Sequence, residues 1–132
     1  MQTYDLIVIG GGPAGYLAGE RAGAAGLKTI GIEKRALGGA GLNEGCLPSK
    51  AFLTSAKIFE YASHGDKYGV TTTAAAIDHQ VVVRRKNKVV KKLVLGVGAK
   101  LKHHKVDVVS AEGVITGKEG GSYTVKAGEE TY

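Results

Sequence analysis

A glycine-rich segment near the start of the chain has the composition to hold a pyrophosphate. Residues 10–15 read Gly-Gly-Gly-Pro-Ala-Gly, the spacing G-x-G-x-x-G. In such a segment Gly10 permits a tight turn, Gly12 lets the backbone approach the phosphates, and Gly15 lets a helix pack closely on a strand. Glu33 ends a later apolar run, where its carboxylate can accept hydrogen bonds from ribose hydroxyls. These residues predict a site for a dinucleotide.

A strand, a helix and a second strand must position this segment. Tyr4–Ile9 predicts a buried strand, since Leu6–Ile9 is continuously apolar as in strands covered on both faces, and Lys28–Ile32 predicts a second short strand. Between them we expect a helix over Pro13–Ala25, with Gly26 at its C-cap. This context favours a ligand site over a glycine-rich turn that binds nothing. The carboxylate of Glu33 would repel a 2′-phosphate, which argues against NADP, but the motif does not separate FAD from NAD.

The single cysteine is the second candidate for chemistry. We expect a helix to begin near Cys46, with Lys50 one turn further on, and both features favour a reactive thiolate. The alternatives are an inert buried cysteine and an ordinary lysine at a helix start. One cysteine allows no internal disulfide, which fits a reducing, cytoplasmic setting.

The segment around Cys46 distinguishes between the two cofactors. Residues 38–50 read G-G-A-G-L-N-E-G-C-L-P-S-K. They resemble the active-site segment of the dihydrolipoamide dehydrogenase and glutathione reductase family, G-G-x-C-x-N-x-G-C-x-P-S-K, and are most similar to the dihydrolipoamide dehydrogenases. The resemblance implies a flavoprotein that passes electrons between NAD(H) and a thiol/disulfide substrate such as a lipoyl group. It places FAD on this domain and NAD on a further domain outside this chain.

The resemblance also assigns roles to single residues. Cys46 is similar to the thiol that lies against the flavin and gives its charge-transfer interaction, and Lys50 to a lysine near the reactive flavin nitrogen. Gly113 matches a position whose backbone approaches the adenine, although a turn explains a glycine there equally well. The cofactor contacts we expect are Gly10, Gly12, Pro13, Ala14, Gly15, Glu33, Lys34, Gly39, Gly41, Lys50 and Gly113.

One position departs from the family pattern. The first of the two redox cysteines falls on Gly41. A thiol–disulfide relay needs two sulfurs, because a neighbouring thiolate must resolve the mixed disulfide. We therefore expect this chain not to perform the relay. A cysteine-to-glycine change and a paralogue that abandoned disulfide chemistry both remain open, and so do an oxidoreductase and a non-catalytic FAD- or nucleotide-binding module.

The remainder of the chain completes the predicted fold. Apolar residues at helical spacing predict a long helix over Ala75–His103, followed by a strand at Val106–Val109. Strand-like stretches at Gly113–Thr116, Ser122–Lys126 and from Thr131 onward predict an antiparallel meander. The expected segments are a β-α-β unit (1–33), the active-site loop and helix (38–62), the long helix (75–104), a strand (106–110) and the meander (112–132). Together they predict an α/β, Rossmann-type FAD-binding domain with a parallel sheet. We expect it to be truncated within the meander.

The basic charge of the chain is concentrated in one helix. The net charge is +6, and Arg84–Lys105 holds nine of the eighteen lysine and arginine residues and no acid. No aromatic side chain interrupts this stretch, so a solvated helix face is a better interpretation than a nucleic-acid groove. His103 and His104 have no cysteine or acid at ligand spacing, and we expect no metal site.

The expected partners follow from the same observations. No apolar run approaches the length of a membrane span, so we expect no membrane partner. A meander cut within a strand leaves unpaired edges, which predicts self-association. For the parent protein, the resemblance implies a lipoyl-bearing protein of a 2-oxoacid dehydrogenase or glycine cleavage system.

Overall fold

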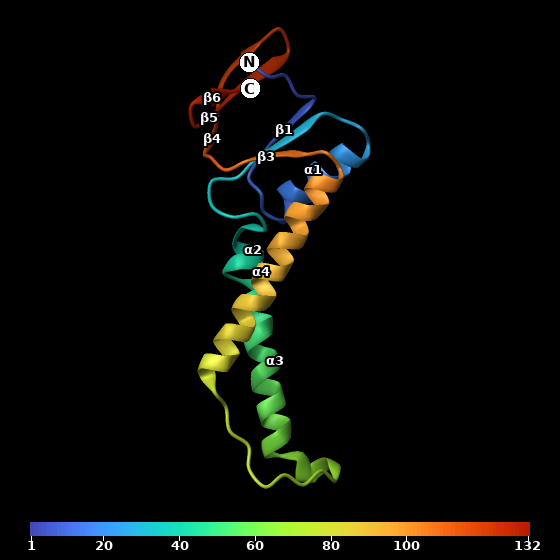
Figure 1. Cartoon of the computed structure of the whole chain (residues 1–132), viewed down its shortest axis with the longest axis vertical. Helices are drawn as coiled ribbons and strands as arrows, with labels where there is room; N and C mark the ends of the chain where they lie inside the picture. The colour runs from blue at the N-terminus through green and yellow to red at the C-terminus, as the bar shows by residue number, and fades with distance from the viewer.

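A three-stranded parallel sheet forms the centre of the molecule. The computed structural model describes residues 1–132 and contains strands β1 (Leu6–Ile9), β2 (Thr29–Ile32) and β3 (Asp107–Val109) in the order β1-β2-β3 (Figure 1). The middle strand is the most buried, and Ile30 and Ile32 are each 1% exposed. Burial of a central strand on both faces favours apolar side chains such as these. The arrangement confirms the predicted α/β class.

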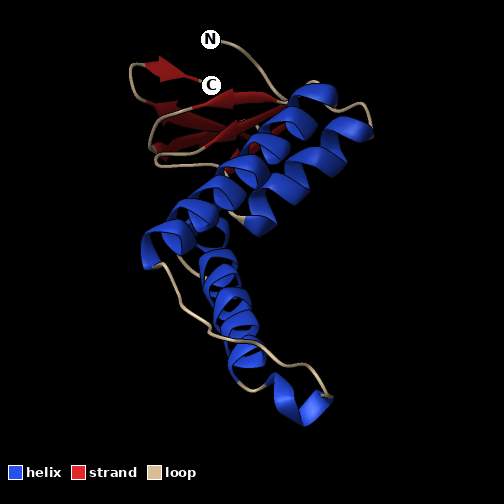
Figure 2. Cartoon of the chain, turned by 60° about the horizontal axis from the view of Figure 1, so that its bottom comes forward, coloured by secondary structure: helices blue, strands red, loops and turns tan.

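Two helices cover one face of this sheet. They are α1 (Pro13–Ala24) and the C-terminal half of α4 (His79–His103), which lie together beside the strands in Figure 2. Small residues allow their close approach, since a Cβ on Gly23 would lie 2.5 Å from the carbonyl oxygen of His104. Helix α1 ends one residue earlier than predicted, so its C-cap is Ala25, and Gly26 follows it with φ +86°, the left-handed conformation that glycine adopts after a helix.

An antiparallel meander covers the opposite face. It consists of β4 (Gly113–Glu119), β5 (Ser122–Ala127) and β6 (Glu130–Thr131). The turn between β4 and β5 has two glycines with positive φ, as tight hairpins require. The main hydrophobic core lies between this meander and the central strand, and it comprises Ile30, Ile32, Val125 and Ala127. The domain therefore has three layers: helices, parallel sheet and meander.

A helical hairpin extends away from these layers. Helix α3 (Cys46–Ser63) runs outward, a 3-10 turn (η1, Gly65–Tyr68) and a loop follow, and α4 returns alongside α3 (Figure 1). The guanidinium of Arg85 donates a hydrogen bond to the carbonyl of Ala51 at 3.2 Å across the pair. The buried residues of α3, Pro48 and Ala51, both lie in its first half. No helix of the chain combines the length and apolar content needed to cross a bilayer.

Several predicted boundaries differ from the observed ones. The long helix begins at His79 and not at Ala75, because Asp78 is extended and its carboxylate caps the N–H of Val81 at 3.1 Å. A short helix, α2 (Gly39–Asn43), occupies part of the expected loop, and η1 lies in the stretch expected to be irregular. The third strand starts at Asp107, after the chain has closed the end of α4.

The end of α4 gives a prediction about stability. Lys105 follows the helix with φ +58°, and hydrogen bonds from the N–H groups of Lys105 and Val106 close the last turn. A side chain disfavours this left-handed conformation, whereas glycine adopts it freely. Lys105→Gly should raise the free energy of unfolding by about 0.5–1 kcal/mol. Urea denaturation followed by circular dichroism measures this, and an unchanged or lower midpoint would contradict it.

Candidate functional site

The turn between β1 and α1 needs two of its glycines for folding alone. Gly10 has φ +101°, a conformation that side chains disfavour, and its N–H donates to the carbonyl of Ile32 at 2.8 Å. A Cβ on Gly15 would lie 1.8 Å from the carbonyl oxygen of Gly10. Glycine at these positions therefore sets the turn and seats the helix against it.

Gly12 lies in the same turn, but neither reason applies to it. Its φ of −71° and ψ of −176° suit any residue. The nearest atom to a Cβ built on Gly12 is the Cα of Gly39 at 4.0 Å, an ordinary contact. Gly12 is also the N-cap of α1, with no capping side chain and no acid in the first turn. Open space thus lies beside a helix N-terminus, where an anion is stabilised.

The second glycine loop docks against this turn. The N–H of Gly38 donates to the carbonyl of Gly11 at 2.8 Å, and a Cβ on Gly39 would lie 2.8 Å from the Cα of Gly12. Gly41 follows in α2, where a Cβ would meet the side chain of Pro13 at 3.5 Å. The structure therefore brings Gly39 and Gly41 to the first turn, a proximity that their separation in the sequence does not reveal.

Glu33, directly after β2, joins the first glycine turn to the segment that follows the strand. Its Oε2 accepts the N–H of Gly11 at 2.6 Å, and its Oε1 accepts the N–H of Arg35 at 2.7 Å. Partial burial opposes ionisation, but hydrogen bonds from the backbones of Arg35, Gly11 and Ala36, with the charge of Arg35, outweigh it and hold the pKa of Glu33 below its ordinary value. A carboxylate has about four acceptor sites, so capacity remains for ribose hydroxyls.

Replacing Glu33 should make stability depend on pH in a defined way. Because the pKa of Glu33 is lowered on folding, its contribution is present above the carboxyl pKa of the unfolded chain and is lost as the pH falls through the folded value. Glu33→Gln should lower the free energy of unfolding by about 2 kcal/mol at neutral pH. Urea denaturation from pH 7 down to about pH 3 should show this gap closing. A gap of constant size would contradict the role of the charge.

The candidate thiol and lysine lie at the start of α3. Cys46 is the first residue of the helix and Lys50 follows one turn later, and both side chains are exposed. The N–H of Ser49 donates to the carbonyl of Gly45 at 3.0 Å, which closes the first turn. No hydrogen bond or ion pair joins the side chain of Cys46 or Lys50 to the glycine loops.

The remaining predicted positions surround the carboxyl ends of the strands. Lys34 follows β2, and its ammonium forms a 3.0 Å ion pair with Glu112. A Cβ on Gly113 would lie 3.1 Å from the side chain of Ile32 and 3.3 Å from that of Ile9. Gly113 is therefore close-packed against the ends of β1 and β2, so packing alone gives a reason for glycine there.

Three polar residues near the site were not among the predicted ones. Asn43 donates to the carbonyls of Leu37 and Gly39 at 3.0 and 2.9 Å. Arg35, just after β2, forms an ion pair with Glu44 in the turn before Cys46. The motif contains Asn43 and Glu44, but nothing in the spacing of the sequence indicates that Arg35 reaches Glu44.

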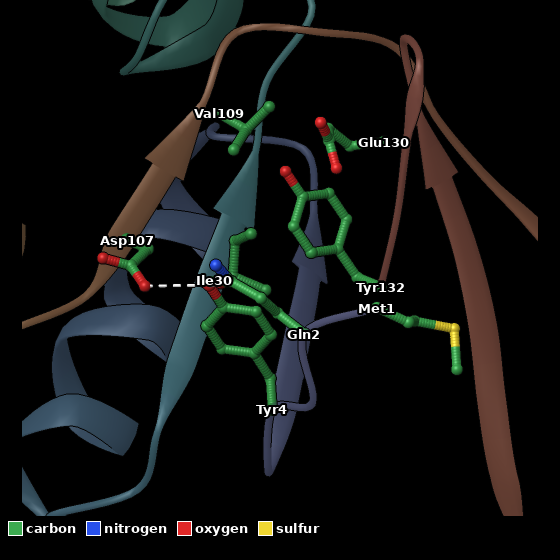
Figure 3. Close-up of a pocket in the computed structure, with 8 residues that line it drawn as sticks. All are labelled: Met1, Gln2, Tyr4, Ile30, Asp107, Val109, Glu130 and Tyr132. Atoms are coloured by element: carbon green, nitrogen blue, oxygen red, sulfur yellow. Dashed lines mark hydrogen bonds between the residues drawn. The ribbon is translucent and has the colours of Figure 1, made fainter.

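A pocket of about 480 Å³ lies at the other end of the sheet (Figure 3). Its lining residues come from both chain ends and from β2 and β3, and none was predicted as a site residue. Tyr4 donates its hydroxyl to the carboxylate of Asp107 at 2.9 Å, and the ring of Tyr132 lies edge-on to it. Burial, and then the hydrogen bond to Asp107, raise the pKa of Tyr4 to about 12. This pocket is separate from the glycine loops.

The family model described as pyridine nucleotide-disulphide oxidoreductase matches residues 4–130. The chain belongs to this family. Pyridine nucleotide-disulphide oxidoreductases similar to it include the dihydrolipoyl dehydrogenase of Bacillus subtilis, 44% identical over 114 residues that cover 86% of this chain and 24% of that protein. The dihydrolipoyl dehydrogenase of Mycoplasma genitalium is 45% identical over 116 residues, covering 87% of this chain and 25% of that protein.

A solved structure agrees with the sequence relatives. The crystal structure of LpdA from Mycobacterium tuberculosis superposes with a TM-score of 0.82 at 25% identity, over 96% of this chain and 28% of that one. The chain thus spans about a quarter of the length of these relatives. The family predicted from the motifs around Gly12 and Cys46 is confirmed.

Proposed function

We propose that this chain is the FAD-binding part of a flavoprotein disulfide oxidoreductase most like dihydrolipoyl dehydrogenase. The observation that carries the proposal is Gly12. Neither its backbone conformation nor its packing requires glycine, yet a side chain there would fill the space beside the N-terminus of α1. A pyrophosphate that approaches the backbone at this point gives the missing reason.

The surrounding residues fit the adenosine half of FAD. The N-terminus of α1 would hold the phosphates through its N–H groups and its dipole. The free acceptor capacity of Glu33 suits the ribose hydroxyls, and its negative charge disfavours a 2′-phosphate. Gly113 packs against the ends of β1 and β2, and we propose that its backbone lies near the adenine. When bound, FAD supplies an acceptor for two electrons.

We infer that Cys46 faces the flavin and that Lys50 lies near its reactive nitrogen. Their support is the match to the family motif and their position on the first turn of α3. With glycine at position 41, a mixed disulfide formed at Cys46 would have no second thiol to resolve it. This observation favours a second candidate function, an FAD-binding module without disulfide chemistry.

For the whole protein we propose NAD-linked oxidation of dihydrolipoyl groups carried by a lipoyl-bearing partner, in the cytoplasm. The names of the relatives support the reaction. We also propose that the 132-residue chain self-associates, because large apolar side chains on the α3–α4 hairpin are exposed, among them Leu53 at 67% and Tyr68 at 73%. Sedimentation velocity should show oligomers that grow with concentration, and a monomer throughout would contradict this.

Titration of FAD into the purified chain tests the proposed function. Binding should change the absorbance and fluorescence of the flavin and saturate at one FAD per chain. Gly12→Ala should weaken FAD binding about tenfold or more, because the added methyl displaces the phosphates. The same substitution should lower the free energy of unfolding only by the amount expected for alanine in place of glycine at an N-cap, about 0.5–1 kcal/mol, since the methyl causes no clash when no ligand is bound. The proposed function would be refuted if the wild-type chain did not bind FAD, or if the wild type and Gly12→Ala bound FAD with equal affinity.

A further inference from the structure

An ion pair connects the end of β2 to the turn that carries the cysteine. Arg35 lies two residues after Glu33, and its guanidinium binds the carboxylate of Glu44. Glu44 in turn lies two residues before Cys46, at the end of α2. The contact joins segments that are neighbours in space but belong to different secondary structure elements.

The backbone of this turn closes on itself. The carbonyl of Ala40 accepts the N–H groups of Glu44 and Gly45, at 2.9 and 2.7 Å. Asn43 and Glu44 are the two side chains that bind the turn to the segment after β2. Asn43 binds the carbonyls of Leu37 and Gly39, whereas the Arg35–Glu44 pair reaches further back, to the second residue after Glu33.

Arg35 also takes part in the contact that orients Glu33. Its backbone N–H donates to Oε1 of Glu33, and Oε2 of the same carboxylate accepts the N–H of Gly11. A polar chain therefore runs from the phosphate-binding turn through Glu33 and Arg35 to Glu44, beside the start of α3. Replacing the side chain of Arg35 breaks only the last link, because the link to Glu33 uses the backbone.

We propose that Arg35 and Glu44 are positioning residues that hold the turn presenting Cys46 against the end of β2. The assignment of Cys46 as a flavin-facing thiol rests on the proposed function. The contact between Arg35 and Glu44 is observed whether or not that function holds. Both side chains are largely exposed, at 68% and 54%, so the pair contributes little to global stability. Its effect is on the geometry and charge around one thiol.

The reaction of Cys46 with iodoacetamide measures this effect without any cofactor. The thiolate attacks the carbon, a C–S bond forms, and iodide leaves. In Arg35→Ala the carboxylate of Glu44, two residues before Cys46 in the sequence, loses its partner. The turn that leads into α3 is then held less firmly. A turn that is held less firmly and carries an unpaired negative charge should present the sulfur less well to the reagent. The second-order rate constant should fall about threefold, the size expected for an exposed ion pair.

Matched variants distinguish the loss of the Arg35–Glu44 ion pair from the loss of a positive charge in general. Lys100→Ala removes a cation that is as exposed as Arg35, at 68%, and whose partner Glu20 lies outside the Cys46 turn, so its rate should equal that of the wild type. Arg35→Lys should retain most of the rate, and the reversed pair Arg35→Glu with Glu44→Arg should restore it to within about twofold. Unfolding midpoints of all variants should agree with the wild type.

Each result of this comparison either supports the positioning role or overturns it. A slower Arg35→Ala that the reversed pair rescues supports the role. Equal effects of Lys100→Ala and Arg35→Ala, no slowing, or no rescue by the reversed pair in a folded protein would each overturn it. FAD affinity is measured separately by flavin fluorescence. A chain that fails to bind FAD but shows the rescue pattern would contradict the proposed function and leave the positioning role standing.

Discussion

Gly15→Ala is expected to destabilise the chain severely. The added Cβ would lie 1.8 Å from the carbonyl oxygen of Gly10 and 3.3 Å from the side chain of Val8. The first contact is with backbone, which no change of rotamer can relieve, so α1 must move away from β1. We expect a loss of about 3 kcal/mol or more, a large fraction of the stability of a small domain.

Urea denaturation followed by circular dichroism measures this loss. Gly12→Ala is the matched control, since it adds the same methyl three residues earlier, where the nearest atom is 4.0 Å away. The control should lose only about 0.5–1 kcal/mol, because its methyl has room and alanine is merely a poorer N-cap than glycine. The two variants should therefore separate folding from ligand binding within one motif. Equal unfolding midpoints for Gly15→Ala and Gly12→Ala would contradict the close packing of α1 against the turn.

Gly41→Cys is expected to create a redox-active disulfide with Cys46. A Cβ at position 41 meets only Pro13, at 3.5 Å, so the side chain fits without displacing the backbone. The turn that Ala40 closes with Glu44 and Gly45 brings the start of α3 back towards α2. With both cysteines, oxidised lipoamide should take two electrons and two protons from the pair. The products are dihydrolipoamide and a disulfide between positions 41 and 46.

Thiol counting with a chromogenic disulfide reagent, together with peptide mass mapping, tests this result. Reduced Gly41→Cys should have two reactive thiols and the oxidised form none, whereas the wild type keeps its single Cys46 thiol. Gly41→Ala is the control, with a side chain at the same position and no sulfur. Disulfides found only between chains would contradict the expected geometry. With FAD bound, a long-wavelength band after reduction would further support Cys46 as the flavin-facing thiol.

Much of the fold follows from local patterns in the sequence. The apolar run ending at Ile9, the glycines at 10 and 15 and the run ending at Ile32 determine the β-α-β unit, because each residue satisfies a local requirement of strand, turn or helix start. The motif around Cys46 likewise indicated the family. The predicted start of the long helix at Ala75 is wrong, because the alanine-rich stretch before His79 contains no strong helix breaker. In the structure Asp78 caps the helix, and the helix begins after it, at His79.

Other features depend on contacts between distant segments, which no local pattern encodes. The sequence determined that residues 10–15 form a glycine turn between a strand and a helix, and that position 41 lacks a thiol. Only the tertiary structure decided that Gly39 packs on Gly12, and that Arg35 reaches Glu44 beside the thiol. Periodicity and spacing report the requirements of a single element. Packing between elements is set by which surfaces meet once the strands pair and the chain folds back on itself.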